Sequence, residues 1–340
     1  MILVTGCAGF IGFHVSSIIL KNKNSKIFGI DNLNSYYDVN LKKNRLKILK
    51  KNKSFFFFKV DLLNKRKIFN LIKKNKIKII VHLAAQAGVR YSILKPEKYI
   101  DSNIKGFLNI LEACRHFKVK NLIYASTSSV YGLSTKIPFK ENDNNTNHPM
   151  QLYAVTKKSN ELMAHAYSWL FNIPTIGLRF FTVYGPWGRP DMSLFKFTKN
   201  IIKNKKINLY NNGNHARDFT YVEDVAKIIY KLIKNPSKKN KSWLKKNSSD
   251  TSLAPYRILN ISYGKKISLK KFVLEIEKNL RKKSKKRYLP MQMGDIKETL
   301  SSKNNLNKYF PEINFTNYKI GVKNFVDWYI KYFKIDLKNI

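Results

Sequence analysis

The chain has 340 residues, of which 44% are apolar and 13% aromatic, enough for a large packed core and too apolar for a disordered chain. Its two cysteines, Cys7 and Cys114, cannot form a disulfide framework, which predicts a reducing, cytoplasmic location. No run approaches the ~20 apolar residues that span a bilayer, so no membrane segment is expected. Met1 leads directly into an apolar run, so no signal peptide is expected either.

The net charge of +44 invites a nucleic-acid hypothesis, because clustered Lys and Arg neutralise phosphates. The excess consists of 55 Lys and only ten Arg, alongside 37 Asn, and it is spread along the chain. Arg suits bidentate phosphate and base contacts, whereas Lys is a hydrated point charge. Lys, Asn, Ile, Phe and Tyr all have A/T-rich codons, so nucleotide bias accounts for the composition. We therefore expect no nucleic-acid partner, and we expect the densest run, Arg281–Arg287, to be a solvated face.

Short apolar runs alternate with helical patterns over the first two thirds of the chain. The runs have the length and composition of parallel strands buried on both faces. They cover Ile2–Thr5, Ile27–Asp31, Phe55–Val60, Lys78–Leu83, Leu122–Ser126 and Thr175–Phe180. One helical pattern lies between Lys78–Leu83 and Leu122–Ser126. There the spacing of a helix packed on a sheet is shown by Ile104, Phe107, Leu108 and Leu111. The alternation predicts an α/β fold with a Rossmann-type doubly wound parallel sheet.

The pattern loosens after about Pro186. Residues Asn235–Asp250 are polar and low in complexity, which predicts an exposed loop. Helices are expected at about Leu269–Lys282 and Val322–Phe333, in a smaller C-terminal lobe.

A glycine motif, Thr5 to Gly12 (TGCAGFIG), joins the first strand to a helix. Gly6 permits a sharp turn, Gly9 lets the backbone approach a pyrophosphate, and Gly12 lets the helix pack on the strand. Asp31 ends the second strand, where a carboxylate accepts hydrogen bonds from ribose hydroxyls and repels a 2′-phosphate. The spacing predicts NAD as the cofactor in preference to NADP.

A second constellation lies further along the chain. Tyr153 and Lys157 stand four residues apart on one helix face. A free tyrosine has a pKa of about 10, so a nearby ammonium and a positive nicotinamide are needed to make it a general base. Upstream, Ser126–Gly132 (STSSVYG) follows an apolar strand, at the edge where parallel sheets bind ligands. A hydroxyl there can bind the oxygen that Tyr153 deprotonates.

Together, TGxxGxxG, STSS before VYG, and YxxxK resemble the extended short-chain dehydrogenase/reductases of the NAD-dependent epimerase/dehydratase family. The likeness runs from Ile2 to about Asp327 and is strongest to the nucleotide-sugar epimerases that act on UDP-glucuronate. The blocks that carry it are DNLNSYYDVNLKKNRL (31–46), HLAAQAGVRYS (82–92), RFFTVYGPWGRPDM (179–192) and RDFTYVEDV (217–225).

The resemblance implies roles for individual residues. Tyr153 would be the catalytic base, Lys157 would hold the nicotinamide ribose, and Thr127 would bind the substrate. The cofactor would be held by Gly6, Gly9, Phe10, Ile11, Gly12, Asp31, Asn32, Asp61, Leu62, Ala84, Ala85, Tyr153 and Lys157. The substrate would be held by Arg90, Thr127, Ser128, Ser129, Thr182, Arg189, Arg217 and Asp295. No metal is expected.

The resemblance also implies an organisation and a partner. Residues 1–180 would form the NAD-binding Rossmann domain, with contributions from about 215–262, and residues 181–340 the UDP-sugar lobe. A homodimer would form through helices at about 101–117 and 153–171. One departure from the family pattern is Met293, where a proline usually precedes Gly294.

The implied reaction is 4-epimerisation of a UDP-sugar through a 4-keto intermediate, with UDP-glucuronate and UDP-galacturonate as the expected pair. Arg189 is the fixed charge expected to hold the uronate carboxylate. Related dehydratases and decarboxylases carry carboxyl groups where this chain has Ser128 and Ser129, so those reactions are set aside. Two alternatives stay open: a 4-epimerase of UDP-glucose or UDP-N-acetylglucosamine, and a non-catalytic NAD-sensing regulator that binds nucleic acid.

Overall fold

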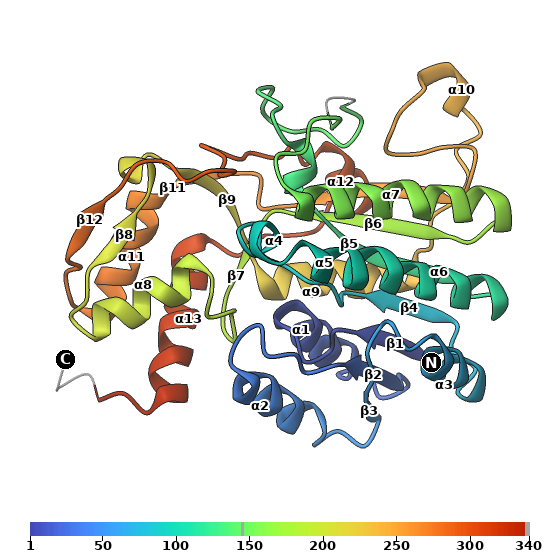
Figure 1. Cartoon of the computed structure of the whole chain (residues 1–340), viewed down its shortest axis with the longest axis horizontal. Coiled ribbons are helices and arrows are strands. Elements are labelled where there is room, and N and C mark those ends of the chain that lie inside the picture. Colours follow the sequence, from blue (N-terminus) through green and yellow to red (C-terminus); the bar gives the residue numbers. More distant parts are fainter. Residues whose placement is uncertain (144–145, 337–340) are drawn as a thin grey trace.

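A seven-stranded parallel sheet forms the centre of the molecule in the computed structural model, which describes residues 1–143 and 146–336 (Figure 1). Its strands are β1 (Ile2–Thr5), β2 (Ile27–Asp31), β3 (Phe55–Lys59), β4 (Ile79–His82), β5 (Asn121–Thr127), β6 (Thr175–Phe180) and β10 (Tyr256–Ile261). Their order is β3-β2-β1-β4-β5-β6-β10, with every neighbouring pair parallel. The order reverses at β1, which places a crevice for ligands beyond the carboxyl ends of β1 and β4.

The predicted doubly wound sheet is confirmed, and each of the six predicted strands is present to within one residue at either end. One expectation is wrong. The strand β3 is not buried on both faces, because Phe56 and Phe58 are 41% and 38% exposed. β3 is the edge strand of the sheet, where Phe56 and Phe58 stack only on Phe28 among the described ring contacts. The composition of a strand does not show whether it lies at the centre or at the edge of the sheet.

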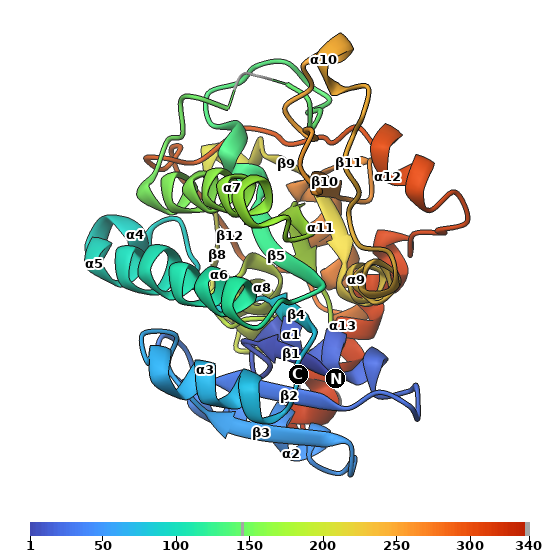
Figure 2. The ribbon, with the colours of Figure 1, turned by 90° about the vertical axis from the view of Figure 1, so that its right-hand side faces the viewer.

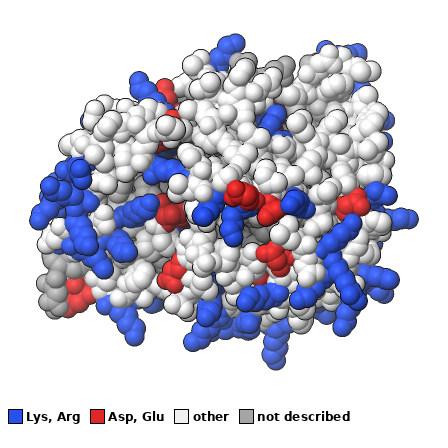
Figure 3. Space-filling model, in the orientation of Figure 1, with Lys and Arg blue, Asp and Glu red and all other residues white. Residues whose placement is uncertain are grey.

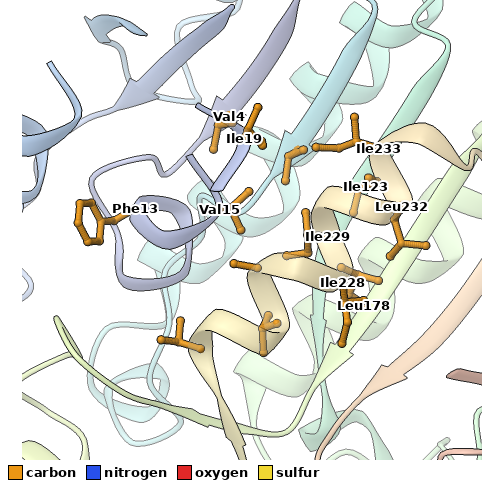
Figure 4. Packing of buried hydrophobic residues seen from close by; sticks show 14 of the residues in the cluster. Val4, Phe13, Val15, Ile19, Ile123, Leu178, Ile228, Ile229, Leu232 and Ile233 are labelled. Carbon is orange, nitrogen blue, oxygen red and sulfur yellow. The ribbon is translucent and has the colours of Figure 1, made fainter. Parts of the chain in front are cut away.

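Helices cover both faces of the sheet (Figure 2). On one face lie α1 (Phe10–Ile19), α2 (Val39–Leu49) and α9 (Val222–Lys234); on the other lie α3 (Lys65–Lys74), α6 (Gly106–His116) and α7 (Leu152–Phe171). Figure 4 shows Val15 and Ile19 of α1 meeting Ile229 and Ile233 of α9 over the strands. Each such fully buried aliphatic side chain contributes about 1.5–3 kcal/mol, so this contact fixes α1 and the loop before it.

The face of α6 that packs on the sheet differs from the predicted one. Phe107, Ile110 and Leu111 are buried, but Leu108 is 40% exposed. The helix follows a π-helical segment, Ile100–Lys105, which contains Ile104. Ile104 therefore lies in a wider π turn that does not continue the α-helical spacing of Phe107 and Leu111.

A smaller lobe holds most of the chain after β6. It contains a sheet of β7 (Thr182–Tyr184), β9 (Ala216–Tyr221) and β11 (Lys266–Ser268), and a pair of β8 (Ile207–Leu209) with β12 (Lys286–Tyr288). Its main helices are α8 (Ser193–Ile202), α11 (Leu269–Leu280) and α13 (Tyr318–Phe333). The stacked rings of Phe219 and Phe272, 4.0 Å apart, join β9 to α11 at the centre of the lobe. The two helices predicted there are confirmed.

The lobe boundary at residue 180 stays a prediction, although β10 and α9 return to the large sheet from the range 215–262 as expected. Four short helices remain: α4 (Tyr91–Leu94), α5 (Pro96–Tyr99), α10 (Trp243–Lys246) and α12 (Asn304–Tyr309). The segment 235–250, expected to be an exposed loop, contains α10 and buries Ser237 and Asp250. That expectation is wrong in part, because Ser237 donates to the Thr175 and Pro255 carbonyls and so ties the segment to the sheet.

The described helices include none that combines the length and apolarity needed to cross a bilayer. Over residues 1–143 and 146–336, no three His, Cys, Asp or Glu side chains gather in a way that suits a metal ion.

Candidate active site

The glycine loop lies at the carboxyl end of β1, and its geometry requires glycine. Gly6 has φ +69°, a region that favours glycine. A Cβ on Gly12 would lie 2.1 Å from the Gly6 oxygen, and a Cβ on Gly6 would lie 2.8 Å from the Ala84 nitrogen. The loop is thus closed against both α1 and the chain after β4. The helix α1 begins at Phe10 and has no acidic residue in its first turn, so its amino end is available to an anionic group.

The acidic residue at the end of β2 is buried beside this loop. Asp31 accepts a hydrogen bond of 2.8 Å from the Leu33 backbone N–H. Burial raises the pKa of Asp31, while that hydrogen bond and the charge of Lys42 lower it by less. Next to it, Asn32 donates a 2.7 Å hydrogen bond to Asp61. Asp31, Asn32 and Asp61 therefore form one polar edge after β2 and β3.

One cavity of about 420 Å³ runs along the carboxyl ends of the strands. Seventeen of the predicted site residues line it: Gly6, Gly9, Phe10, Ile11, Gly12, Asp31, Asn32, Leu62, Ala84, Ala85, Thr127, Ser128, Ser129, Tyr153, Lys157, Thr182 and Arg189. The other four predicted residues, Asp61, Arg90, Arg217 and Asp295, do not line this cavity. The glycine cradle and the buried acid at one end fit a dinucleotide, and the polar side chains at the other end leave a place for a second ligand.

Tyr153 and Lys157 lie in the first turns of α7, facing the end of β5. Burial raises the pKa of the Tyr153 phenol, and the Thr127 hydroxyl and the charge of Arg189 lower it by less. The Lys157 ammonium donates a 2.9 Å hydrogen bond to the Ala125 carbonyl, and burial lowers its pKa to about 8. In the ligand-free molecule the phenol is therefore protonated at neutral pH. A positive charge bound beside it is what would make it a base.

A buried ion pair lies behind these residues and was not predicted from the sequence. Glu161 accepts two 2.9 Å hydrogen bonds from Arg179 on β6 and one of 2.6 Å from the Ser126 hydroxyl. Burial raises the pKa of Glu161, but the charge and hydrogen bonds of Arg179 outweigh burial and lower it. The signal was present in the spacing: residues 153, 157 and 161 share one helix face. The pair fixes the strand end on which Thr127 stands.

The far end of the cavity is lined by hydroxyl groups and one arginine. Ser128, Ser129 and Thr182 line it, and Ser129 donates its backbone N–H to the Thr127 hydroxyl at 3.2 Å. Arg189 forms a fork with Asp191: Nε donates to Oδ1 at 2.9 Å, and Nη2 donates to Oδ2. Burial alone would lower the pKa of Arg189, but the hydrogen bonds and charge of Asp191 raise it. The arginine is therefore a permanent cation held on the cavity wall.

Arg90, which precedes α4, meets Arg217 and Asp295 of the smaller lobe in a second cluster. Asp295 lies 2.8 Å from Arg217 and 3.9 Å from Arg90, and His215 Nε2 lies 3.5 Å from it. Met293 is exposed, and Gly294 has φ +72° and accepts a hydrogen bond from Gln151. The turn before Asp295 is thus formed with Met293 at the position where the family usually has a proline. In this cluster one carboxylate balances the charges of two arginines. An anionic ligand can bind here by replacing Asp295 as the partner of the arginines.

Several cavity residues were missed by sequence reasoning, although they lie in blocks that the resemblance quoted. Tyr36 and Lys42 line the cavity, and the Lys42 ammonium donates to the Asn34 carbonyl at 2.8 Å. Arg45 is buried and donates to the Ala8 carbonyl in the glycine loop and to the Trp187 carbonyl before Arg189. Local sequence gives no sign that the segment 31–46 joins these two loops, because the partners are 37 and 142 residues away.

The parallel sheet, glycine cradle and Tyr-Lys-Thr group together define a dinucleotide-dependent enzyme that exchanges alcohol and carbonyl groups. The chain matches the NAD dependent epimerase/dehydratase family over residues 2–244 and belongs to that family.

Individual relatives are similar over their whole lengths. Protein CapI of Staphylococcus aureus is 50% identical, covering 98% of this chain and 99% of its own. A probable UDP-glucuronate 4-epimerase of Rhizobium meliloti is 41% identical, covering 96% of both chains. The crystal structure of UDP-glucuronic acid 4-epimerase from Bacillus cereus, in complex with UDP-glucuronic acid and NAD, superimposes with a TM-score of 0.86 at 31% identity, covering 97% of this chain and 99% of that one.

Proposed function

We propose that this protein is an NAD-dependent UDP-sugar 4-epimerase that interconverts UDP-glucuronate and UDP-galacturonate. The observation that carries the proposal is the composition of the cavity beyond Tyr153: a fixed cation, Arg189, with the hydroxyls of Ser128, Ser129 and Thr182. These are groups that bind a carboxylate. The activities of the relatives described above support the same substrate.

The glycine cradle and Asp31 would hold the dinucleotide, with Lys157 and Ala84 toward its nicotinamide end. NAD supplies a hydride acceptor that takes the C4 hydride and later returns it. Thr127 would bind the sugar O4 while Tyr153 accepts the hydroxyl proton, so that a C4 carbonyl forms. When the keto sugar has turned over, Tyr153 gives the proton back to O4 and the configuration at C4 is inverted.

The proposed substrate adds a requirement that the cavity meets. Its 4-keto form is a β-keto acid, which loses carbon dioxide when the carboxylate bond aligns with the carbonyl π system. Arg189 and its neighbouring hydroxyls would hold the carboxylate out of that alignment. Among the described residues that line the cavity, Asp31 has the only carboxyl group, and β2 is separated from β5 by two strands. At a separation of about 14 Å, this one lining carboxyl group is too far from Tyr153 for chemistry at C5 or C6.

The substitution Arg189→Leu tests the carboxylate assignment. We expect at least a 100-fold loss of UDP-glucuronate turnover, measured by chromatographic separation of the product, with Tyr153 chemistry otherwise intact. Arg66→Leu, on α3 and outside the cavity lining, is the matched control and should leave turnover unchanged. Unchanged kinetics in Arg189→Leu would overturn the assignment. Turnover of UDP-glucose or UDP-N-acetylglucosamine in its place would favour the neutral-sugar alternative.

We further propose a homodimer formed through α6 and α7. These packed helices carry exposed apolar side chains, among them Leu108, Leu162, Trp169 and Leu170. An exposed apolar surface of this kind favours association with a second copy. Sedimentation should give a dimer for the native chain and a monomer for Leu162→Asp. Leu274→Asp on α11 is the control, and a monomeric native chain would refute the proposal.

No nucleic-acid partner is part of the proposed function. In Figure 3 lysines and arginines stand at several places around the visible face and do not form one stripe. Cys7 and Cys114 are free thiols buried in separate clusters of the core, which supports the proposed reducing, cytoplasmic location. Binding to mixed-sequence DNA that persists near physiological salt would favour the regulator alternative instead.

A further inference from the structure

Arg189 is held from two directions by groups that the carboxylate assignment does not use. Asp191 occupies Nε and Nη2, the side of the guanidinium. The ring of Tyr36 lies 5.8 Å from the guanidinium carbon, within the range of a cation–π contact. The Tyr36 hydroxyl donates to Asp191 Oδ2 at 3.2 Å, so the three side chains form a closed group.

Tyr36 is itself fixed by the cavity wall. Its ring lies 4.9 Å from that of Tyr91, which continues to Tyr99 and, through it, to Tyr153. Gly88, at φ +104°, approaches so closely that a Cβ there would lie 2.2 Å from the Tyr36 oxygen. The phenol therefore has little room to move, and its hydrogen bond fixes the Asp191 carboxylate in turn.

Only one edge of the guanidinium is left for a ligand. An arginine offers two edges for a bidentate carboxylate: Nε with Nη2, and Nη1 with Nη2. Asp191 takes the first through Nε and Nη2, which leaves Nη1 outside this fork. Burial would raise the pKa of Asp191, but the hydrogen bonds and charge of Arg189 lower it, so the carboxylate is ionised at neutral pH.

We propose that Asp191 and Tyr36 are positioning residues that present the Nη1 edge of Arg189 to the uronate carboxylate and so protect the keto intermediate from decarboxylation. This inference rests on the proposed function. Asp191 also balances the charge of Arg189. The substrate carboxylate therefore meets an oriented donor edge on an arginine whose charge already has a partner. A carboxylate gripped by a free arginine would be harder to release while the sugar turns over.

If this positioning is lost, we expect a side reaction, which is decarboxylation of the 4-keto intermediate. If the carboxylate aligns with the C4 carbonyl, the C5–C6 bond breaks and carbon dioxide leaves. The bonding electron pair then forms an enolate across C5, C4 and O4, and a proton from water restores C5. Return of the stored hydride to C4 gives a UDP-pentose, so the electrons balance without any further reductant.

The test is the product distribution of Asp191→Asn, with Tyr36→Phe as a graded variant that keeps the ring and removes the hydrogen bond. With UDP-glucuronate as substrate, we expect kcat/KM to fall about tenfold and the UDP-pentose fraction to rise several-fold in Asp191→Asn. Both changes should be smaller in Tyr36→Phe. The control Asp327→Asn removes an exposed carboxylate on α13 and should change neither quantity.

The outcomes separate the alternatives. A lower kcat with an unchanged KM and an unchanged pentose fraction would show a merely structural role and overturn the proposal, as would native kinetics. If Asp191→Asn fails to fold, Tyr36→Phe decides by the same two readouts. Failure of the proposed function shows separately, because the native enzyme would then form no UDP-galacturonate.

Discussion

The two ends of the cavity are built in different ways. At the dinucleotide end, shape comes from backbone: three glycines, a helix amino terminus and a buried acid whose partner is the Leu33 N–H. At the end proposed for the sugar, the wall carries hydroxyl groups and one paired charge, Arg189 with Asp191. A second paired cluster, Arg217 with Asp295, lies outside the cavity lining. Both ends join segments that are distant in sequence: Gly6 packs against Ala84 at the first end, and the Tyr36 hydroxyl donates to Asp191 at the second. A ligand fits into the first end and must compete for partners at the second.

The largest expected effect lies where the two ends meet. Tyr153→Phe removes the group that takes the proton while keeping the ring and its contact with Tyr99. Because general-base catalysis contributes about 10²–10⁴-fold, we expect kcat to fall by about 10³-fold. UDP-sugar binding, measured by calorimetry, should be retained. Activity within tenfold of native would remove Tyr153 from the mechanism.

The buried pair of Glu161 with Arg179 should contribute to stability, whereas the pairs near the sugar end are expected to exchange partners with a ligand. Glu161→Gln leaves the buried Arg179 without its counter-charge, which costs about 3–5 kcal/mol of unfolding free energy. The exposed pair of Asp327 with Lys323 is the control, where Asp327→Asn should cost at most about 1 kcal/mol. Denaturant titration measures both. Equal losses would show that burial does not distinguish the two kinds of pair.

Lys157 is expected to trade stability for function. Burial lowers its pKa to about 8, so below pH 8 the folded chain keeps a charge in an unfavourable place. Between pH 8 and about 10.4 the unfolded chain binds the extra proton, and stability rises with pH. Lys157→Met should abolish turnover, yet raise the unfolding free energy at pH 7 by about 1–2 kcal/mol after loss of the hydrogen bond to Ala125.

The gain in unfolding free energy of Lys157→Met should shrink as the pH approaches 10. The native lysine is then neutral in the folded chain, so its burial no longer removes a charge from water. Chemical denaturation from pH 7 to 9.5 measures the difference from the native chain. A difference that does not depend on pH would contradict the burial of a charged ammonium at this position.

The smallest effect is expected at the exchangeable pair on the substrate lobe. Arg217→Lys keeps the charge and loses the planar guanidinium, whose Nη2 donates to Asp295 at 2.8 Å. We expect KM for the UDP-sugar to rise about tenfold with kcat nearly unchanged, since one bidentate contact contributes on the order of 1–2 kcal/mol. Steady-state kinetics measure both constants. A fall in kcat without a change in KM would place Arg217 in the chemical step instead.

The same contrast explains what could be predicted from the sequence. The sheet, the glycine loop and the Tyr153–Lys157 spacing are local patterns, and the structure places them in one cavity. The fork between Arg189 and Asp191 joins residues two positions apart and follows no periodic pattern. The contact of Tyr36 with Asp191 and the Glu161–Arg179 pair depend on which segments meet in the fold. Periodicity does not encode that choice. The edge position of β3 was missed for the same reason.

The most direct test of the account is the product that the native protein makes from UDP-glucuronate. Purified chain supplied with NAD and UDP-glucuronate should yield UDP-galacturonate, resolved by chromatography and confirmed by retention of the carboxyl carbon. UDP-xylose as the sole product would contradict the argument that Arg189 and its hydroxyl neighbours prevent decarboxylation. Absence of any product would contradict the assignment of the cavity to a uronate.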